Sequence, residues 1–244
     1  MPGDGGAVAQ VTADFTRDGL MTKLRRGFRI AGHVAASLVV VLLASNGAAA
    51  EKAEYRLRDP ALEVVRIDSS PRESFLSMRA DASGRLFVGG REAVFVYEPD
   101  ADSEAGGLGK RREIFRFPAD SWVYDLEIRG NDLYAMTNRA LYLLPGAVTK
   151  RTGVQAKRLV WGHPDYHPHQ CFHGLAWGPD GYLYLSLGDM LVFYGDFRRP
   201  DHWGHWTFFC QPEGTRVPYT GVGGVLRCLP DGSDLQVVAR GTRN

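Results

Sequence analysis

Residues 173–189, HGLAWGPDGYLYLSLGD, predict two short β-strands joined by a tight turn. Leucines alternate with tyrosines and a serine over 182–187, which is the period-two pattern of a strand with two different faces. The intervening GPDG at 178–181 is a turn sequence, because proline presets φ, aspartate bonds its own backbone and glycine accepts positive φ. The stretch therefore predicts a β-hairpin.

The same strand–turn–strand pattern occurs three times, over 75–88, 122–135 and 172–185. Each hairpin precedes two further strand-like segments, at 93–97 and 113–117, at 140–144 and 157–160, and at 224–228 and 235–238. The second hairpin strands begin at Leu86, Leu133 and Leu183, which are 47 and then 50 residues apart. Four strands in a repeat of nearly fifty residues are typical of a β-propeller blade. A β-sandwich would not recur at this period.

We therefore expect an all-β fold with about three four-stranded blades, roughly over 75–118, 122–161 and 172–240. Three blades cannot close a ring, so the chain is predicted to be a partial β-propeller and the N-terminal part of a longer protein. A candidate ring-closing strand lies at 62–67, within a lead-in at 51–74.

The first fifty residues carry the features of a signal peptide. An apolar run over 30–44 leads to the small residues 48–50, and it follows a basic region of Lys23, Arg25, Arg26 and Arg29. We expect cleavage after Ala50, a periplasmic or secreted protein, and no membrane span after cleavage. An uncleaved anchor is the alternative, and residues 1–20 read as a mis-called extension before a true start at Met21.

Composition narrows the classes of partner and chemistry. The formal net charge is +1, and beyond the basic region in the first fifty residues the Lys and Arg residues are not clustered, which argues against nucleic acid as the main partner. The sequence contains no P-loop and no C-x-x-C-H haem attachment motif. Cys171, Cys210 and Cys228 are an odd number for an exported protein, so one disulfide is open and its pair is not determined by the sequence.

Polar residues stand at both ends of the 173–189 hairpin. His173 precedes the first strand and Asp189 follows the second, so both side chains can face one rim, as a general base and its orienting carboxylate would. The alternative is a strand cap and a turn residue. His163, His167, His169 and His173 lack cysteine or carboxylate at ligand spacing, so we assign no metal site to them.

A long insertion over 189–224 interrupts the third repeat and is rich in aromatic residues, histidine and arginine. Loops of this length inside a compact domain are commonly functional. Trp203, His205 and Trp206 could form the wall of a sugar site, or they could pack the insertion against the blades.

These motifs resemble the glucose/sorbosone dehydrogenase family of soluble quinoproteins. The closest likeness is to large exported bacterial proteins in which such a propeller precedes helical repeats and a c-type haem module. The resemblance covers roughly 75–244 and rests on HGLAWGPDGYLYLSLGD, RPDHWGHWTF and GGVLRCLPDGSDLQVVARGTRN. It implies a six-bladed ring that binds pyrroloquinoline quinone (PQQ) on its axis, commonly with calcium.

The resemblance also implies roles for individual residues. His173 would be the catalytic base, with His169 as the competing candidate, Asp189 would orient it, and Arg243 would contact the quinone. Further cofactor-binding candidates are Asn244, Trp203 and His205. The implied reaction is hydride transfer from a sugar or alcohol to PQQ, with a c-type haem domain outside this chain as electron acceptor, and the chain alone would be inactive. The alternative is a non-catalytic propeller that binds a glycan or a protein partner.

Overall fold

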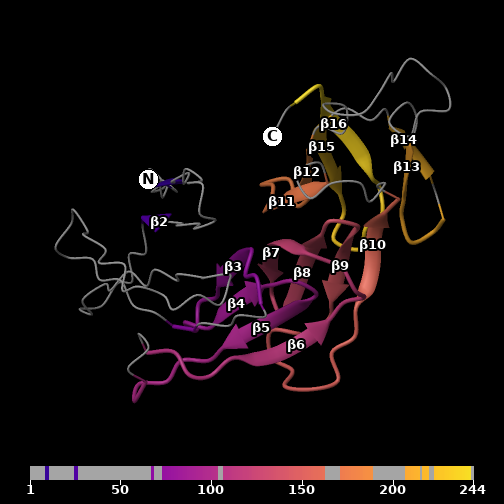
Figure 1. Cartoon of the computed structure of the whole chain (residues 1–244). Helices are drawn as coiled ribbons and strands as arrows, with labels where there is room; N and C mark the ends of the chain where they lie inside the picture. Colours follow the sequence, from indigo (N-terminus) through magenta and orange to yellow (C-terminus); the bar gives the residue numbers. More distant parts are fainter. Residues whose placement is uncertain are drawn as a thin grey trace, which may run out of the picture. The chain divides into compact units, whose positions relative to one another are not determined.

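The computed structural model describes residues 9–10, 25–26, 67–68, 73–103, 107–162, 171–188, 207–214, 216–219 and 223–242. These residues are all-β, and no helix long and apolar enough to cross a membrane is found among them (Figure 1). The chain divides into one unit of residues 1–74 and 99–109 and another of 75–98 and 110–244. In the first unit, β1 (Ala9–Gln10) pairs with β2 (Arg25–Arg26) in antiparallel fashion.

The described residues of the second unit form three antiparallel sheets. Blade 1 is the sheet β3 (Ser77–Ala80), β4 (Leu86–Gly89), β5 (Ala93–Tyr97) and β6 (Arg112–Arg116). Blade 2 begins with β7 (Val123–Arg129), β8 (Asp132–Thr137), β9 (Ala140–Leu144) and β10 (Lys157–Trp161). Blade 3 is β11 (Phe172–Trp177), β12 (Leu183–Leu187), β15 (Gly224–Cys228) and β16 (Gln236–Arg240).

The three sheets are arranged as successive blades of a propeller. Their first strands lie next to one another, because β7 contacts β3 on one side and β11 on the other. In each blade the next strands follow outward in chain order, apart from the insertion between β12 and β15. The expected all-β, propeller-like fold is therefore confirmed (Figure 1): among the described residues two of the blades have the expected four strands and blade 2 has six.

Two hydrophobic cores lie between consecutive blades. One joins blades 1 and 2 through residues such as Phe87, Val94, Val123 and Leu126. The other joins blades 2 and 3 and includes the inward-facing leucines of β12, which alternate with partly buried residues as the sequence pattern predicts. Burial of apolar side chains between sheet faces is the main force that holds the blades together.

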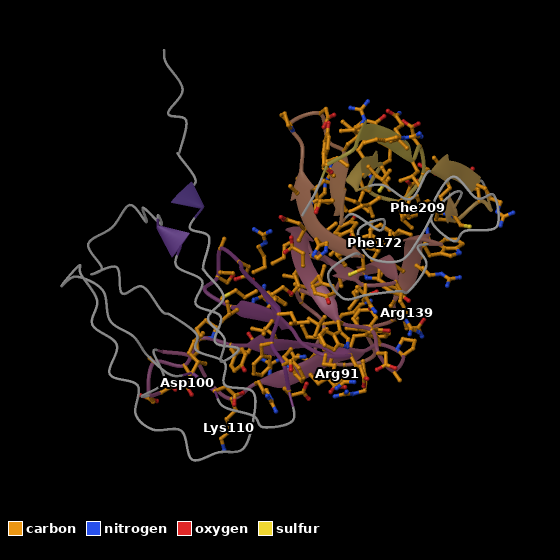
Figure 2. The ribbon with its side chains drawn as sticks, turned by 45° about the horizontal axis from the view of Figure 1, so that its top comes forward. Arg91, Asp100, Lys110, Arg139, Phe172 and Phe209 are labelled. Atoms are coloured by element: carbon orange, nitrogen blue, oxygen red, sulfur yellow. The ribbon has the colours of Figure 1, made fainter. Side chains whose placement is uncertain are left out.

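The insertion returns to the preceding blade. Its hairpin of β13 (Thr207–Cys210) and β14 (Arg216–Tyr219) pairs with the outer strand β10, where Trp161 lies opposite Cys210, so blade 2 has six strands. The ring of Phe209 lies 5.6 Å from that of Phe172 in blade 3, and Figure 2 shows both rings. This hairpin therefore joins blades 2 and 3, a connection that the sequence did not predict.

All three cysteines lie among the described residues, and no disulfide joins them. Cys171 and Cys228 are buried and Cys210 is partly buried. Burial raises the pKa of the Cys228 thiol to about 12, so this thiol stays protonated at neutral pH. The expected signal peptide lies outside the described residues, except for the strands β1 and β2. The expected ring-closing strand at 62–67 also lies outside them, except for residue 67.

Candidate functional site

His173 occupies the extra position of a β-bulge at the start of blade 3. Phe172 pairs with Leu187 and Gly174 with Ser186, so His173 has no opposite residue in β12. The Gly188 amide donates to the Cys171 carbonyl at 2.9 Å, which brings the start of β11 and the end of β12 to one rim. Bulges re-aim side chains and are common beside active sites.

Tyr124 has the same place in blade 2. The register of β7 shifts between Val123 and Asp125, so Tyr124 is the bulged residue of that first strand. Its ring lies 5.5 Å from the His173 ring at an interplanar angle of 49°. The Trp122 ring follows at 6.4 Å from the Tyr124 ring. The two bulges thus place the His173 imidazole beside the Tyr124 ring, and the ring of Trp122, just before β7, continues the row.

An arginine and a carboxylate extend this row. The Arg91 guanidinium lies 5.5 Å from the centre of the Trp122 ring and pairs with Asp120 at 3.2 Å. Both ionic side chains are about half exposed or more, with exposed fractions of 49% for Arg91 and 63% for Asp120. We call Arg91, Asp120, Trp122, Tyr124 and His173 the rim cluster. Solvent screening makes the stabilisation from this exposed ion pair small. The pair nevertheless presents hydrogen-bond donors and acceptors beside the Trp122 ring.

The backbone beneath Arg91 and Trp122 is tightly held. Glu92 and Asp120 both adopt left-handed conformations, with φ of 72° and 61°, which are uncommon for residues other than glycine. The Glu92 carboxylate accepts from the Asp120 amide at 2.9 Å. Asn138 accepts from the Trp122 amide at 3.0 Å and donates to the Asp120 carbonyl at 3.0 Å. These bonds fix the loop that carries Trp122.

The groups with shifted pKa values in blade 3 lie at the opposite end of the β11–β12 hairpin. The Tyr182 hydroxyl donates to Asp234 at 2.6 Å, and this bond raises the pKa of Tyr182. Two hydrogen bonds lower the pKa of Asp234, the larger effect coming from the Gln236 side chain and the smaller from the Tyr182 hydroxyl. Arg227 pairs with Asp180 at 3.0 Å beside them. These exposed, mutually satisfied groups stabilise two turns and do not form a reactive centre.

Most of the residues assigned from the sequence lie outside the described part of the chain. This applies to Asp189, Arg243, Asn244, His169, Trp203 and His205. Of the predicted catalytic set, only His173 is placed. The described residues contain no group of three or more histidine, cysteine, aspartate or glutamate side chains arranged to hold a metal ion.

Sequence reasoning missed Tyr124, Trp122 and Arg91. The repeat itself carried a usable signal, because the register of the two blades aligns Tyr124 with His173, 49 residues later. Aligning the repeats at their first strands, and not only at their second strands, would have shown an aromatic residue at the position of the predicted base. Arg91 and Trp122 form an isolated bridge between blades, which no local pattern indicates.

The order of the sheets and the contacts between their first strands show a β-propeller-like fold. No protein-family model matches it, and no curated protein sequence matches it significantly. Selenomethionine-substituted virginiamycin B lyase from Staphylococcus aureus is similar in structure over 67% of this chain and 54% of that chain, with 13% identity and a TM-score of 0.36. A catalytically inactive variant of that lyase with quinupristin is similar over 70% and 72%, with 11% identity and a TM-score of 0.32.

The chain thus spans about half the length of the first of these structures. TM-scores of 0.36 and 0.32 carry no inference about function. The propeller assignment stands on the order of the sheets and the contacts between their first strands.

Proposed function

We propose that the chain is part of an exported PQQ-dependent sugar or alcohol dehydrogenase-like propeller of the glucose/sorbosone type. The observation that supports this most directly is the position of His173. The residue that the resemblance makes the base is a bulged residue on a first strand, partly buried beside the Tyr124 ring. An imidazole held in this way is suited to general base catalysis.

In this proposal the neutral His173 imidazole accepts the proton of a substrate hydroxyl. The Tyr124 ring restricts the orientation of the imidazole, and the Trp122 ring offers an apolar face to a sugar. PQQ, when bound, supplies the redox capacity by accepting the hydride equivalent. Aromatic rings such as those of Tyr124 and Trp122 are of a kind that stacks on a planar quinone. The residues assigned to contact it, Arg243 and Asn244, lie outside the described residues. Calcium and a c-type haem acceptor belong to the same proposal.

The test reconstitutes the complete natural protein with PQQ and calcium and measures sugar-dependent dye reduction. His173→Gln should lower turnover by roughly 100-fold or more, while the absorbance change on PQQ binding is retained. His169→Gln is the matched control and should leave turnover near that of the wild type. Wild-type protein that neither reduces dye nor changes the PQQ spectrum would refute the proposal, and loss of turnover in His169→Gln alone would assign the base to His169.

Glycan binding without catalysis is the second candidate, and the Arg91–Asp120–Trp122 part of the rim cluster favours it. An indole face beside a guanidinium and a carboxylate can stack on a pyranose ring and bond its hydroxyls. Saccharide binding, measured by calorimetry, should then be lost in Trp122→Phe and kept in His173→Gln. Trp177→Phe is the control, because Arg129 stacks on Trp177 at 4.6 Å at the far end of β7. Wild-type protein that binds no saccharide would exclude this candidate.

A further inference from the structure

We propose that Asp125 is a positioning residue for His173, acting through the backbone of β11. This inference rests on the proposed function, in which His173 is the base. Asp125 follows the bulged Tyr124, and its Oδ2 accepts from the Leu175 amide of blade 3 at 2.8 Å. Its Oδ1 accepts from the Leu126 amide at 2.8 Å. A carboxylate that accepts two backbone N–H bonds is strongly held, so it fixes blade 3 two residues after His173.

The first half of β11 needs this support. A bulge disrupts the ladder at its extra residue, and among the described strands β11 lies at a sheet edge, with β12 as its ladder partner. Gly174, the residue after His173, has no side chain with which to hold the strand. A Cβ at this position would be crowded, because it would lie 2.9 Å from Ser186 Oγ and 3.9 Å from Asp125 Oδ2. The bond from the Leu175 amide to Asp125 therefore holds the bulged segment to β7, in addition to the ring contact of Tyr124 with His173.

In blade 1, too, a side chain of the first strand forms a hydrogen bond with the backbone of the next blade, but through a serine hydroxyl. Ser77 of blade 1 occupies the same repeat position as Asp125 of blade 2. Ser77 pairs with Gly89 and Asp125 pairs with Met136, and each of these partners is the fourth residue from the aligned leucine, Leu86 or Leu133, in its second strand. The Ser77 hydroxyl donates to the Val123 carbonyl of blade 2 at 3.0 Å. A side chain at this repeat position thus bonds the next blade's first strand in both cases. Of these two bonds, the one made by Asp125 reaches the strand that carries His173.

The test compares Asp125→Asn with Ser77→Ala in the complete natural protein. The amide side chain of Asp125→Asn retains one carbonyl oxygen but lacks the second acceptor, so one of the two backbone amides is left without its bond. We expect kcat to fall about tenfold or more, since small misplacements of a catalytic group are costly, with a smaller change in KM. The His173 imidazole signal in the NMR spectrum, assigned by comparison with His173→Gln, should shift, and its rate of modification by diethylpyrocarbonate should change. Ser77→Ala should lower stability and leave these His173 signals unchanged.

Each result decides one question. If Asp125→Asn leaves the NMR signal and modification rate of His173 as in the wild type, the positioning role is refuted, whatever the turnover. If both readouts change while the wild-type protein reduces no dye with PQQ, the positioning role holds and the proposed function fails. Asp125→Ser, which copies the residue of blade 1, serves if Asp125→Asn does not fold. Its His173 signals should also differ from those of the wild type, and identical signals would again refute the role.

Discussion

His173 and Tyr124 show how one inserted residue decides the direction of a side chain. Each is the extra residue of a β-bulge, and their rings meet across two blades at 5.5 Å. In an unbulged strand, successive side chains alternate between two faces, so a one-residue shift changes which side chains share a face. The chemistry proposed for His173 therefore depends on the bulge as much as on the imidazole.

Tyr134 gives a pH-dependent prediction at the same scale. Burial, and then the Asp132 charge, raise the pKa of this phenol from 10.0 to about 12, and its hydroxyl donates to the Pro230 carbonyl at 3.0 Å. The contribution of the protonated Tyr134 to the stability of the folded protein is fully present below its pKa in the unfolded chain, 10.0. This contribution is lost as the pH rises through its pKa in the folded protein, about 12. Between about pH 9 and about pH 11 the free energy of unfolding should fall by about 1 kcal/mol through this residue.

Urea unfolding of wild type and Tyr134→Phe at both pH values checks this expectation. The variant cannot ionise at this position, so its loss of stability over the same interval should be smaller by that amount. Other tyrosines contribute equally to both proteins, including Tyr142, whose pKa burial also raises. An identical pH dependence in the two proteins would contradict the prediction.

Among the larger elements, the β13–β14 hairpin is the one whose place depends most on distant contacts. It extends blade 2 although it comes from the insertion of blade 3. Phe209 is fully buried against the core between blades 2 and 3, and Gln211 accepts from the Leu235 amide at 3.0 Å. Two side chains of the same segment thus fasten the hairpin to blade 3, while its backbone pairs with blade 2.

Phe209→Ala should therefore destabilise the protein by about 3–5 kcal/mol through loss of burial and the cavity left behind. Hydrogen exchange should show the loss of protection first in β13 and β14. Val238→Ala is the control, because Val238 is 50% exposed and its truncation should change stability by less than about 0.5 kcal/mol. A cost for Phe209→Ala below about 1 kcal/mol would mean that the hairpin is not anchored by this ring.

Across the whole second unit, stability comes from the packing of each blade against the next. Gly89 marks how closely blades 1 and 2 approach. A Cβ at this position would lie 2.3 Å from Ser77 Oγ and 2.6 Å from Val123 Cγ1, distances that are shorter than van der Waals contact. The absence of a side chain at residue 89 is therefore a condition for the first strands of these two blades to meet.

Gly89→Ala should cost about 1–3 kcal/mol, because the added methyl group would have to displace Ser77 of its own blade and Val123 of blade 2. Val123→Ala removes the nearest carbon atom of blade 2. The double variant should then lose less stability than the sum of the two single losses, as expected for residues in contact. Equilibrium unfolding of the four proteins in urea measures this coupling, and strictly additive losses would show that the two positions do not meet.

The amino-acid sequence by itself determined the strands and their grouping. Alternation in 182–187 and the GPDG turn predicted the β11–β12 hairpin, and the near-fifty-residue repeat predicted three four-stranded sheets. These features depend on local backbone preferences and on which face of a strand is buried, and both are written in neighbouring residues. His173 was also selected as a candidate base in this way, since it stands at the end of a predicted hairpin.

Only the tertiary structure decided which residues meet between blades. The contact of Tyr124 with His173, the bond from Leu175 to Asp125 and the return of β13 to β10 all join segments that are far apart in the chain. Such contacts depend on the register and bulges of two sheets at once and on the angle at which the sheets pack. No periodicity within a single strand carries that information, because it arises only when the blades are assembled.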